Sequence, residues 1–206
     1  MPRPAGSANA DFAAKRAALL DALLAALLDA AEPPSLRALA RAAGAAVPTL
    51  NHYFGDRPAV LAAVFAHAHA RGAEPLRVAA TPDGPAESSV PALLRHAWAG
   101  LDRGGVGRLH ELGLREGLAD PAVAAAYRRG VLDPTLDAFA ARLTAHALKG
   151  ELAVPDPRRA AAALLGPLLL ARLHQAGLHG AADRPLDPDA LIEDLAAAFL
   201  RGHRPA

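Results

Sequence analysis

The side chains best suited to chemistry in this sequence lie between residues 47 and 54. A helix over this segment turns its apolar side chains inward at i, i+3 and i+7 spacing. The side chains left facing outward are Thr49, Asn51, His52 and Tyr53. An ordinary solvated face carries Glu, Lys and Arg, whereas these short hydrogen-bonding groups and rings suit base edges and phosphate oxygens in a DNA major groove. A polar turn between two packed helices is the alternative that spacing alone leaves open.

The residues before this face predict the first helix of a helix-turn-helix. Leu36, Leu39 and Ala40 follow helical spacing, and Ser35 can cap the start of that helix. Gly44 is expected to form the turn, because a tight link between two crossing helices favours a residue that tolerates a positive φ. The segment from residue 35 to 57 is therefore expected to position the outward-facing side chains.

The run LRALARAAGAAVPTLNHYFGDRPAVLAAV, residues 36–64, resembles the DNA-binding domain of the TetR/AcrR family of transcriptional regulators. The matching positions are Leu39-Ala40, Ala43-Gly44, Thr49-Leu50, His52-Tyr53-Phe54-Gly55 and Arg57. The resemblance implies binding to double-stranded operator DNA. The residues expected to bind DNA are Arg37, Val47, Pro48, Thr49, Asn51, His52, Tyr53 and Arg57.

Four positions depart from the family pattern. Asn51 replaces the usual tyrosine, Ala46 a capping serine, Ala45 a valine and Pro58 a glutamate. The missing serine removes an N-cap worth roughly 1 kcal/mol. Asn51 changes a surface that contacts DNA in relatives, so the operator sequence does not transfer from them. Pro58 is structurally benign in the first turn of a helix.

Composition indicates an all-α protein that is soluble and cytoplasmic. Of the 206 residues 52% are hydrophobic, mostly alanine and leucine, with few β-branched or aromatic residues. There is no cysteine, hence no disulfide and no thiolate metal site. No apolar run is long enough to span a membrane, and residues 1–9 contain no hydrophobic signal core. The net charge of +1 predicts only a modest salt dependence of DNA binding.

The sequence divides into an N-terminal three-helix helix-turn-helix domain over residues 1–57, with a flexible arm at 1–9, and a C-terminal helical ligand-binding and dimerisation domain over 58–206. Outside the helix-turn-helix, the expected helices are 11–31, 58–71, 90–103, 108–118, 122–149, 157–177 and 187–202. Residues 81–89 are the clearest loop. Pro134 is expected to kink or split the helix that contains it.

The C-terminal domain offers candidates for a small-molecule pocket. Polar-tipped and aromatic residues stand out among its Ala/Leu-rich helices, and an apolar pocket with a few polar groups is the usual ligand site. The predicted pocket residues are His69, Trp98, His110, Leu114, Tyr127 and His174. The run HELGL at residues 110–114 lacks the second histidine of a zinc protease helix, so no metal site is expected, and no cofactor.

The last two helices carry more apolar surface than packing on one neighbour requires, which predicts a partner. In the resembling family they form an intersubunit four-helix bundle, so a homodimer through about 157–177 and 187–202 is implied. Such a dimer would read a roughly palindromic operator. The resemblance thus implies a repressor, not an enzyme, that is released by an unknown small-molecule effector. The alternatives are a helical carrier or enzyme with a degenerate head that does not bind DNA, and a purely dimeric interaction module.

Overall fold

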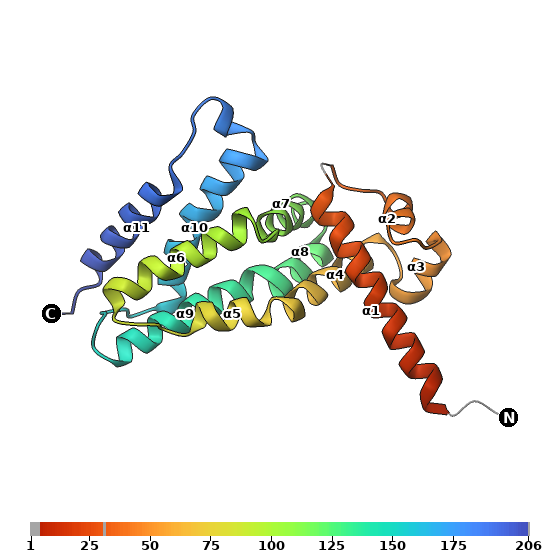
Figure 1. The fold of residues 1–206 in the computed structure, drawn as a ribbon, viewed down its shortest axis with the longest axis horizontal. Coiled ribbons are helices and arrows are strands. Elements are labelled where there is room, and N and C mark those ends of the chain that lie inside the picture. Colours follow the sequence, from red (N-terminus) through yellow and green to blue (C-terminus); the bar gives the residue numbers. More distant parts are fainter. Residues whose placement is uncertain (1–4, 31, 206) are drawn as a thin grey trace. The chain divides into compact units, whose positions relative to one another are not determined.

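The computed structural model of the chain describes residues 5–30 and 32–205. In these ranges the regular elements are helices and no strand occurs, which confirms the all-α prediction (Figure 1). None of the helices in that part of the chain is long and apolar enough to cross a membrane.

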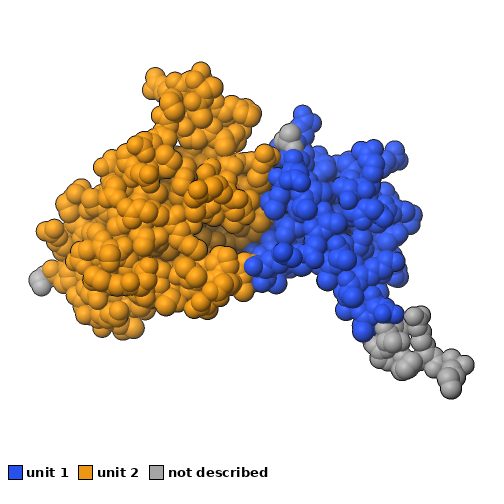
Figure 2. All heavy atoms as spheres, viewed as in Figure 1, with its two compact units in different colours: residues 1–71, 112–130 blue, residues 72–111, 131–206 orange. Residues whose placement is uncertain are grey.

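The chain forms two compact units, coloured separately in Figure 2. Unit 1 comprises residues 1–71 and 112–130, and unit 2 comprises residues 72–111 and 131–206. A segment from the middle of the chain therefore completes the unit that contains the N-terminus. The functional division predicted between residues 57 and 58 is a different property and stays a prediction.

Unit 1 is built on a long first helix. Its elements are α1 (Ala5–Asp29), α2 (Leu36–Ala42), α3 (Val47–Phe54), α4 (Arg57–Arg71), the end of α7 (Val106–Gly117) and α8 (Pro121–Tyr127). Helix α1 packs on α2 and α4, while α4 also contacts α3 and α8. The α1 residues that reach the core are Leu19, Leu20, Leu23 and Leu27, at the helical spacing expected from the sequence.

Unit 2 holds the larger hydrophobic core. Its elements are α5 (Ala73–Ala80), α6 (Ala86–Asp102), the start of α7, α9 (Asp133–Leu148), α10 (Pro157–Arg172) and α11 (Pro188–Gly202). Helix α9 packs on α5 and α10, and α6 packs on α10 and α11. Phe139, Leu93, Leu164 and Ile192 bring side chains from four of these helices into one core. Two π-helical segments, Arg128–Leu132 and Leu173–Gly177, and a short 3₁₀ turn, Gly180–Ala182, connect the helices.

Asp-Pro pairs start three helices. At α8, α10 and α11 the proline is the first helical residue, where its missing N–H costs nothing. The aspartate before it caps the helix: Asp120 accepts from the Ala122 amide at 2.8 Å and Asp156 from the Arg159 amide at 2.9 Å. Asp187 accepts from the Asp189 amide at 2.9 Å. These helix starts follow from two adjacent residues each.

The fourth Asp-Pro pair, Asp133-Pro134, lies where the sequence predicted a break in one long helix. The structure confirms the break, since α8 ends at Tyr127, a π-helical segment covers Arg128–Leu132, and α9 begins at Asp133. Pro134 lacks the N–H that would continue the α-helical ladder across this point. The wider π turn absorbs the mismatch.

Three boundaries differ from the prediction. Helix α1 begins at Ala5, earlier than the expected start at residue 11, so residues 5–9 of the predicted arm are helical, while residues 1–4 and 31 lie outside the described residues. Helix α5 (Ala73–Ala80) was not anticipated. The expected loop over 81–89 is shorter, because α6 begins at Ala86, whose amide donates to the Glu151 carboxylate at 2.9 Å. A cap from 65 residues away is invisible to local pattern.

Candidate DNA-binding face

The turn between α2 and α3 has the expected geometry. The Ala38 amide donates to the hydroxyl of Ser35 at 3.2 Å, which confirms the predicted N-cap of α2. Leu39 and Ala40 are buried beneath it. Gly44 has φ +62°, a left-handed conformation in which glycine is strongly preferred. The sequence therefore specifies this turn locally.

Helix α3 begins at Val47 and is anchored through Leu50, which is fully buried. Val47 and Phe54 are half-buried on the same side. Ala46 precedes the helix in an extended conformation and makes no side-chain capping bond, as expected from the missing serine. Gly55 ends the helix at φ +96°.

The outer face of α3 carries polar side chains that are at least partly accessible to solvent. Asn51 and His52 are exposed, and Thr49 and Tyr53 are half-buried. Among residues 10–30 and 32–205, whose side chains the structure describes, none of these four side chains makes a hydrogen bond to another residue. Pro48 and Arg37 are also exposed. The face is accessible, with donors and acceptors directed outward.

An aromatic cluster joins α1 to this face through Phe12. Phe12 is 43% exposed, so it does not belong to the core. Its ring stacks on Tyr53 with centroids 4.7 Å apart and meets His52 edge-on at 6.2 Å. The guanidinium of Arg16 lies 5.2 Å from the centroid of Phe54.

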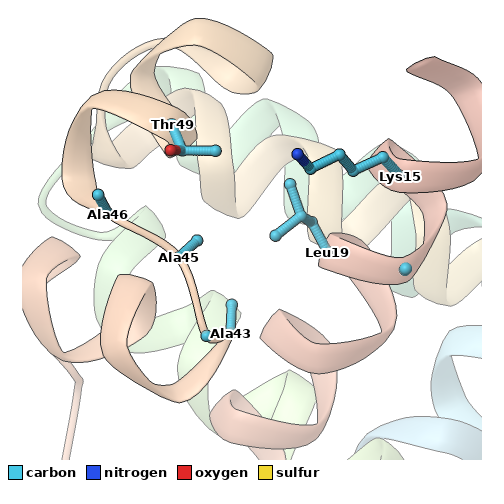
Figure 3. A pocket seen from close by; sticks show the side chains of 8 residues that line it. Lys15, Leu19, Ala43, Ala45, Ala46 and Thr49 are labelled. Atoms are coloured by element: carbon cyan, nitrogen blue, oxygen red, sulfur yellow. The ribbon is translucent and has the colours of Figure 1, made fainter. Parts of the chain in front are cut away.

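A hollow of ≈ 340 Å³ lies between α1 and the α2–α3 turn. Figure 3 shows Lys15 extending from α1 toward Thr49, with Leu19 and the alanines of the turn lining the remainder. Lys15 is exposed and is one of only two lysines in the chain, which is the sequence signal that would have singled it out. The side chain of Lys15 therefore places a positive charge beside the outer face of α3.

Arg57 has a partner that its sequence context did not reveal. Its guanidinium donates to both carboxylate oxygens of Glu116, at 2.5 and 3.0 Å, and to the Pro34 carbonyl at 3.3 Å. The hydrogen bonds from Arg57 hold the pKa of Glu116 below its usual value. In this structure the guanidinium is thus engaged within unit 1, and a role for Arg57 in DNA binding stays a prediction.

The predicted pocket residues fall in both units, and their role stays a prediction. In unit 1, His69 is exposed on α4, Leu114 is half-buried, and Tyr127 is buried with its ring centroid 5.8 Å from that of Phe65. Burial raises the pKa of Tyr127.

In unit 2, Trp98 is half-buried, His110 is fully buried and His174 is exposed. Burial lowers the pKa of His110 to about 4. His110 is therefore neutral near pH 7, and His174 lies on the surface of its unit.

A second polar constellation, in unit 2, has the connectivity of a hydrolase triad. The Ser89 hydroxyl lies 2.9 Å from Nε2 of His146, whose Nδ1 lies 2.6 Å from Glu151. Both Ser89 and His146 are fully buried, and Arg142 donates to the Ser89 hydroxyl at 2.8 Å. A nucleophile must reach its substrate, which this burial prevents, so the group is structural.

The C-terminal part of the chain matches a known family. Residues 92–204, more than half of the chain, match the family model described as the C-terminal domain of AefR-like transcriptional repressors. No curated protein matches the chain significantly in sequence.

Solved structures resemble the chain over nearly its whole length. A TetR-family transcriptional regulator from Mesorhizobium loti has a TM-score of 0.77 and 21% identity, covering 94% of this chain and 98% of that one. FadR from Bacillus subtilis, crystallised in complex with stearoyl-CoA, has a TM-score of 0.69 and 16% identity, covering 90% and 97%. These similarities extend the shared fold to the helix-turn-helix, which the family model does not cover.

Proposed function

Because the chain belongs to the TetR family of transcriptional regulators, we propose that it is a repressor that binds a palindromic operator as a homodimer and is released by a small molecule. Members of this family are DNA-binding transcription factors without catalytic activity, so the chain is a regulator and not an enzyme. The matched description as a repressor C-terminal domain supports repression. The proposed site of action is the cytoplasm.

The observation that carries the proposal is the outer face of α3. Asn51 and His52 are exposed with no hydrogen-bond partner among the described residues, and Thr49 lies beside them. An asparagine can bond N6 and N7 of adenine, and a threonine can contact the thymine methyl group. A helix of eight residues anchored by one buried leucine leaves its polar side chains free to enter a major groove.

Contacts to the phosphate backbone of DNA are the second part of the proposal. Lys15 stands in the hollow next to α3, and Arg37 is exposed on α2. Contacts to phosphates fix the register of a protein on DNA without reading its sequence. We assign Lys15 and Arg37 to phosphates, and Thr49, Asn51 and His52 to bases.

Exposed surface on α10 and α11 supports the dimer. Helix α10 displays Ala163, Gly166 and Leu170 at i, i+3 and i+7 spacing, and Leu170 is 67% exposed. A Cβ added at Gly166 would meet no atom within 4 Å in this chain, so the stripe has room for a second helix. On α11, Ala197 and Ala198 are exposed as well. Two-fold pairing would place two α3 helices on a symmetric operator.

The effector is proposed to bind within the predicted C-terminal ligand-binding domain, residues 58–206. If a ligand lowers the affinity of the protein for its operator, the operator must lower the affinity of the protein for that ligand by the same factor. The coupling free energy is typically about 1–3 kcal/mol. Repression and release then follow from one equilibrium.

The experiment begins with selection of a duplex from random DNA by the purified wild-type protein. Binding of the selected duplex is then measured for His52→Ala and Thr49→Ala by fluorescence anisotropy. Loss of a base contact is expected to cost about 1–3 kcal/mol, which is roughly fivefold to 150-fold in Kd. Thr144→Ala, an exposed threonine on α9, is the matched control and should bind as wild type. If no duplex is enriched, the proposed function is wrong.

The dimer is tested by sedimentation. Leu170→Asp should give monomers at micromolar concentration and lose operator binding. Leu118→Asp, which places the same charge at a leucine that is 88% exposed in unit 1, should remain dimeric. A wild-type monomer at that concentration would contradict the proposed assembly.

A further inference from the structure

Helix α1 continues well beyond the core that it supports. Its first buried residue in the described part is Leu19, and residues 10–18 are exposed except for half-buried Arg16. An isolated helical extension gains little from propensity alone. The contacts that this extension makes are therefore informative about its role.

Those contacts fall on three consecutive aromatic-type residues of α3. Phe12 stacks on Tyr53 at 4.7 Å with an interplanar angle of 26°, and meets His52 at 6.2 Å and 85°. One helical turn later, Arg16 lies over the ring of Phe54. Offset stacking and edge-to-face contact are the two favoured arrangements of aromatic rings. The extension therefore contacts the rings of His52 and Tyr53 on the outer face of α3, and also the ring of Phe54.

Core packing does not account for Phe12, because 43% of its surface remains exposed and its ring neighbours lie on the outer face of α3. His52 and Tyr53 also contact one another, with centroids 5.3 Å apart and planes at 80°. Three rings thus support each other's orientation at the surface. A side chain that is held in its bound orientation loses less entropy on binding.

We propose that Phe12 is a positioning residue for operator reading, which acts by holding His52 and Tyr53 in the orientation that DNA requires. The inference rests on the proposed DNA-binding function and adds the N-terminal half of α1 to the recognition surface. It concerns a residue outside the helix-turn-helix itself.

The test measures binding of Phe12→Ala to the duplex selected by the wild-type protein. An aromatic pair of this kind corresponds to about twofold to tenfold in Kd per protomer. Alanine has the highest helix propensity, so the substitution does not weaken α1 intrinsically. A second duplex is altered at the base pair whose recognition is lost in His52→Ala. We expect Phe12→Ala to prefer the selected duplex over this altered one less strongly than the wild-type protein does. The slope of log Kd against log salt should not change. Phe12→Tyr should restore both affinity and preference.

Two further measurements separate positioning from other roles. Leu118→Ala, another exposed apolar residue of unit 1, should bind as wild type. In a His52→Ala/Tyr53→Ala background, Phe12→Ala should have no further effect. An equal loss in both backgrounds, or a changed salt slope, would overturn the inference. Wild-type binding by Phe12→Ala would also refute it while leaving the proposed function intact, whereas failure of the wild-type protein to enrich any duplex would refute the proposed function.

Discussion

The outer face of α3 and the surroundings of Arg142 treat polar side chains in opposite ways. Arg142 is 3% exposed, yet its guanidinium donates to the carbonyls of Ala79 and Val78, each at 2.7 Å, and to Asp83 at 3.0 Å. On α3, by contrast, Asn51 and His52 are exposed and make no such bonds within the described residues. Polar groups that are satisfied internally maintain the fold, whereas groups left open are available to a ligand.

The Arg142 cluster also explains the shape of the segment around it. The two carbonyls belong to the end of α5, and Ser89, which receives another bond from Arg142 at 2.8 Å, lies in the first turns of α6. One side chain thus fixes both sides of the loop between these helices. Such a network stabilises only when every member is satisfied.

The largest expected effect comes from breaking this cluster. Arg142→Met leaves buried carbonyls and the Ser89 hydroxyl without their donor, and should lower the free energy of unfolding by about 3–5 kcal/mol. Urea denaturation of the full chain measures this change in the free energy of unfolding. Arg77→Met, which removes an exposed pair with Glu74, should leave the free energy of unfolding nearly unchanged. A loss below about 1 kcal/mol for Arg142→Met would mean that the network is not a structural centre.

A second prediction concerns His110, a buried group whose charged form is disfavoured. Its pKa in the folded protein is about 4, below the usual value of 6.5, because of burial. Between these two pH values the unfolded chain takes up a proton at His110 that the folded chain does not. The contribution of His110 to the free energy of unfolding is therefore fully present above pH 6.5 and is lost as the pH falls toward 4. The loss should reach about 3 kcal/mol.

Denaturation at pH 7 and at pH 4.5 checks this contribution. His110→Leu should remove it and therefore show a shallower decline than wild type. His69→Leu, which replaces an exposed histidine, controls for loss of an imidazole. Identical pH profiles for wild type and His110→Leu would show that His110 takes up its proton equally in both states.

The smallest expected effect sharpens the description of the open face. Lys15→Ala should lower the magnitude of the slope of log Kd against log salt by about one per protomer, because one phosphate contact is lost. Preference among DNA sequences should not change. Lys149→Ala, the only other lysine and exposed after α9, should leave the slope as in wild type. An unchanged slope in Lys15→Ala would remove Lys15 from the interface.

Much of the helix-turn-helix over residues 35–57 was predictable, because the residues that specify it act on their sequence neighbours. Ser35, Gly44 and Leu50 each act within a few residues, and the structure confirms the cap, the turn and the anchor. Tyr53 and Phe12 are different, since their stacking joins positions 41 apart in sequence. Helical spacing carries no information about the contacts that a helix makes beyond the core that it supports.

By itself the sequence determined most of the helical segments, though not α5, where Asp-Pro pairs start three of them, and that residues 35–57 form a helix-turn-helix, because caps, turns and periodicity are short-range. Only the tertiary structure decided that α6 starts at Ala86, that Arg57 pairs with Glu116, and that His110 is buried. Those properties depend on carboxylates and apolar surfaces that are distant in sequence. Their partners are chosen by packing, which one-dimensional spacing does not encode.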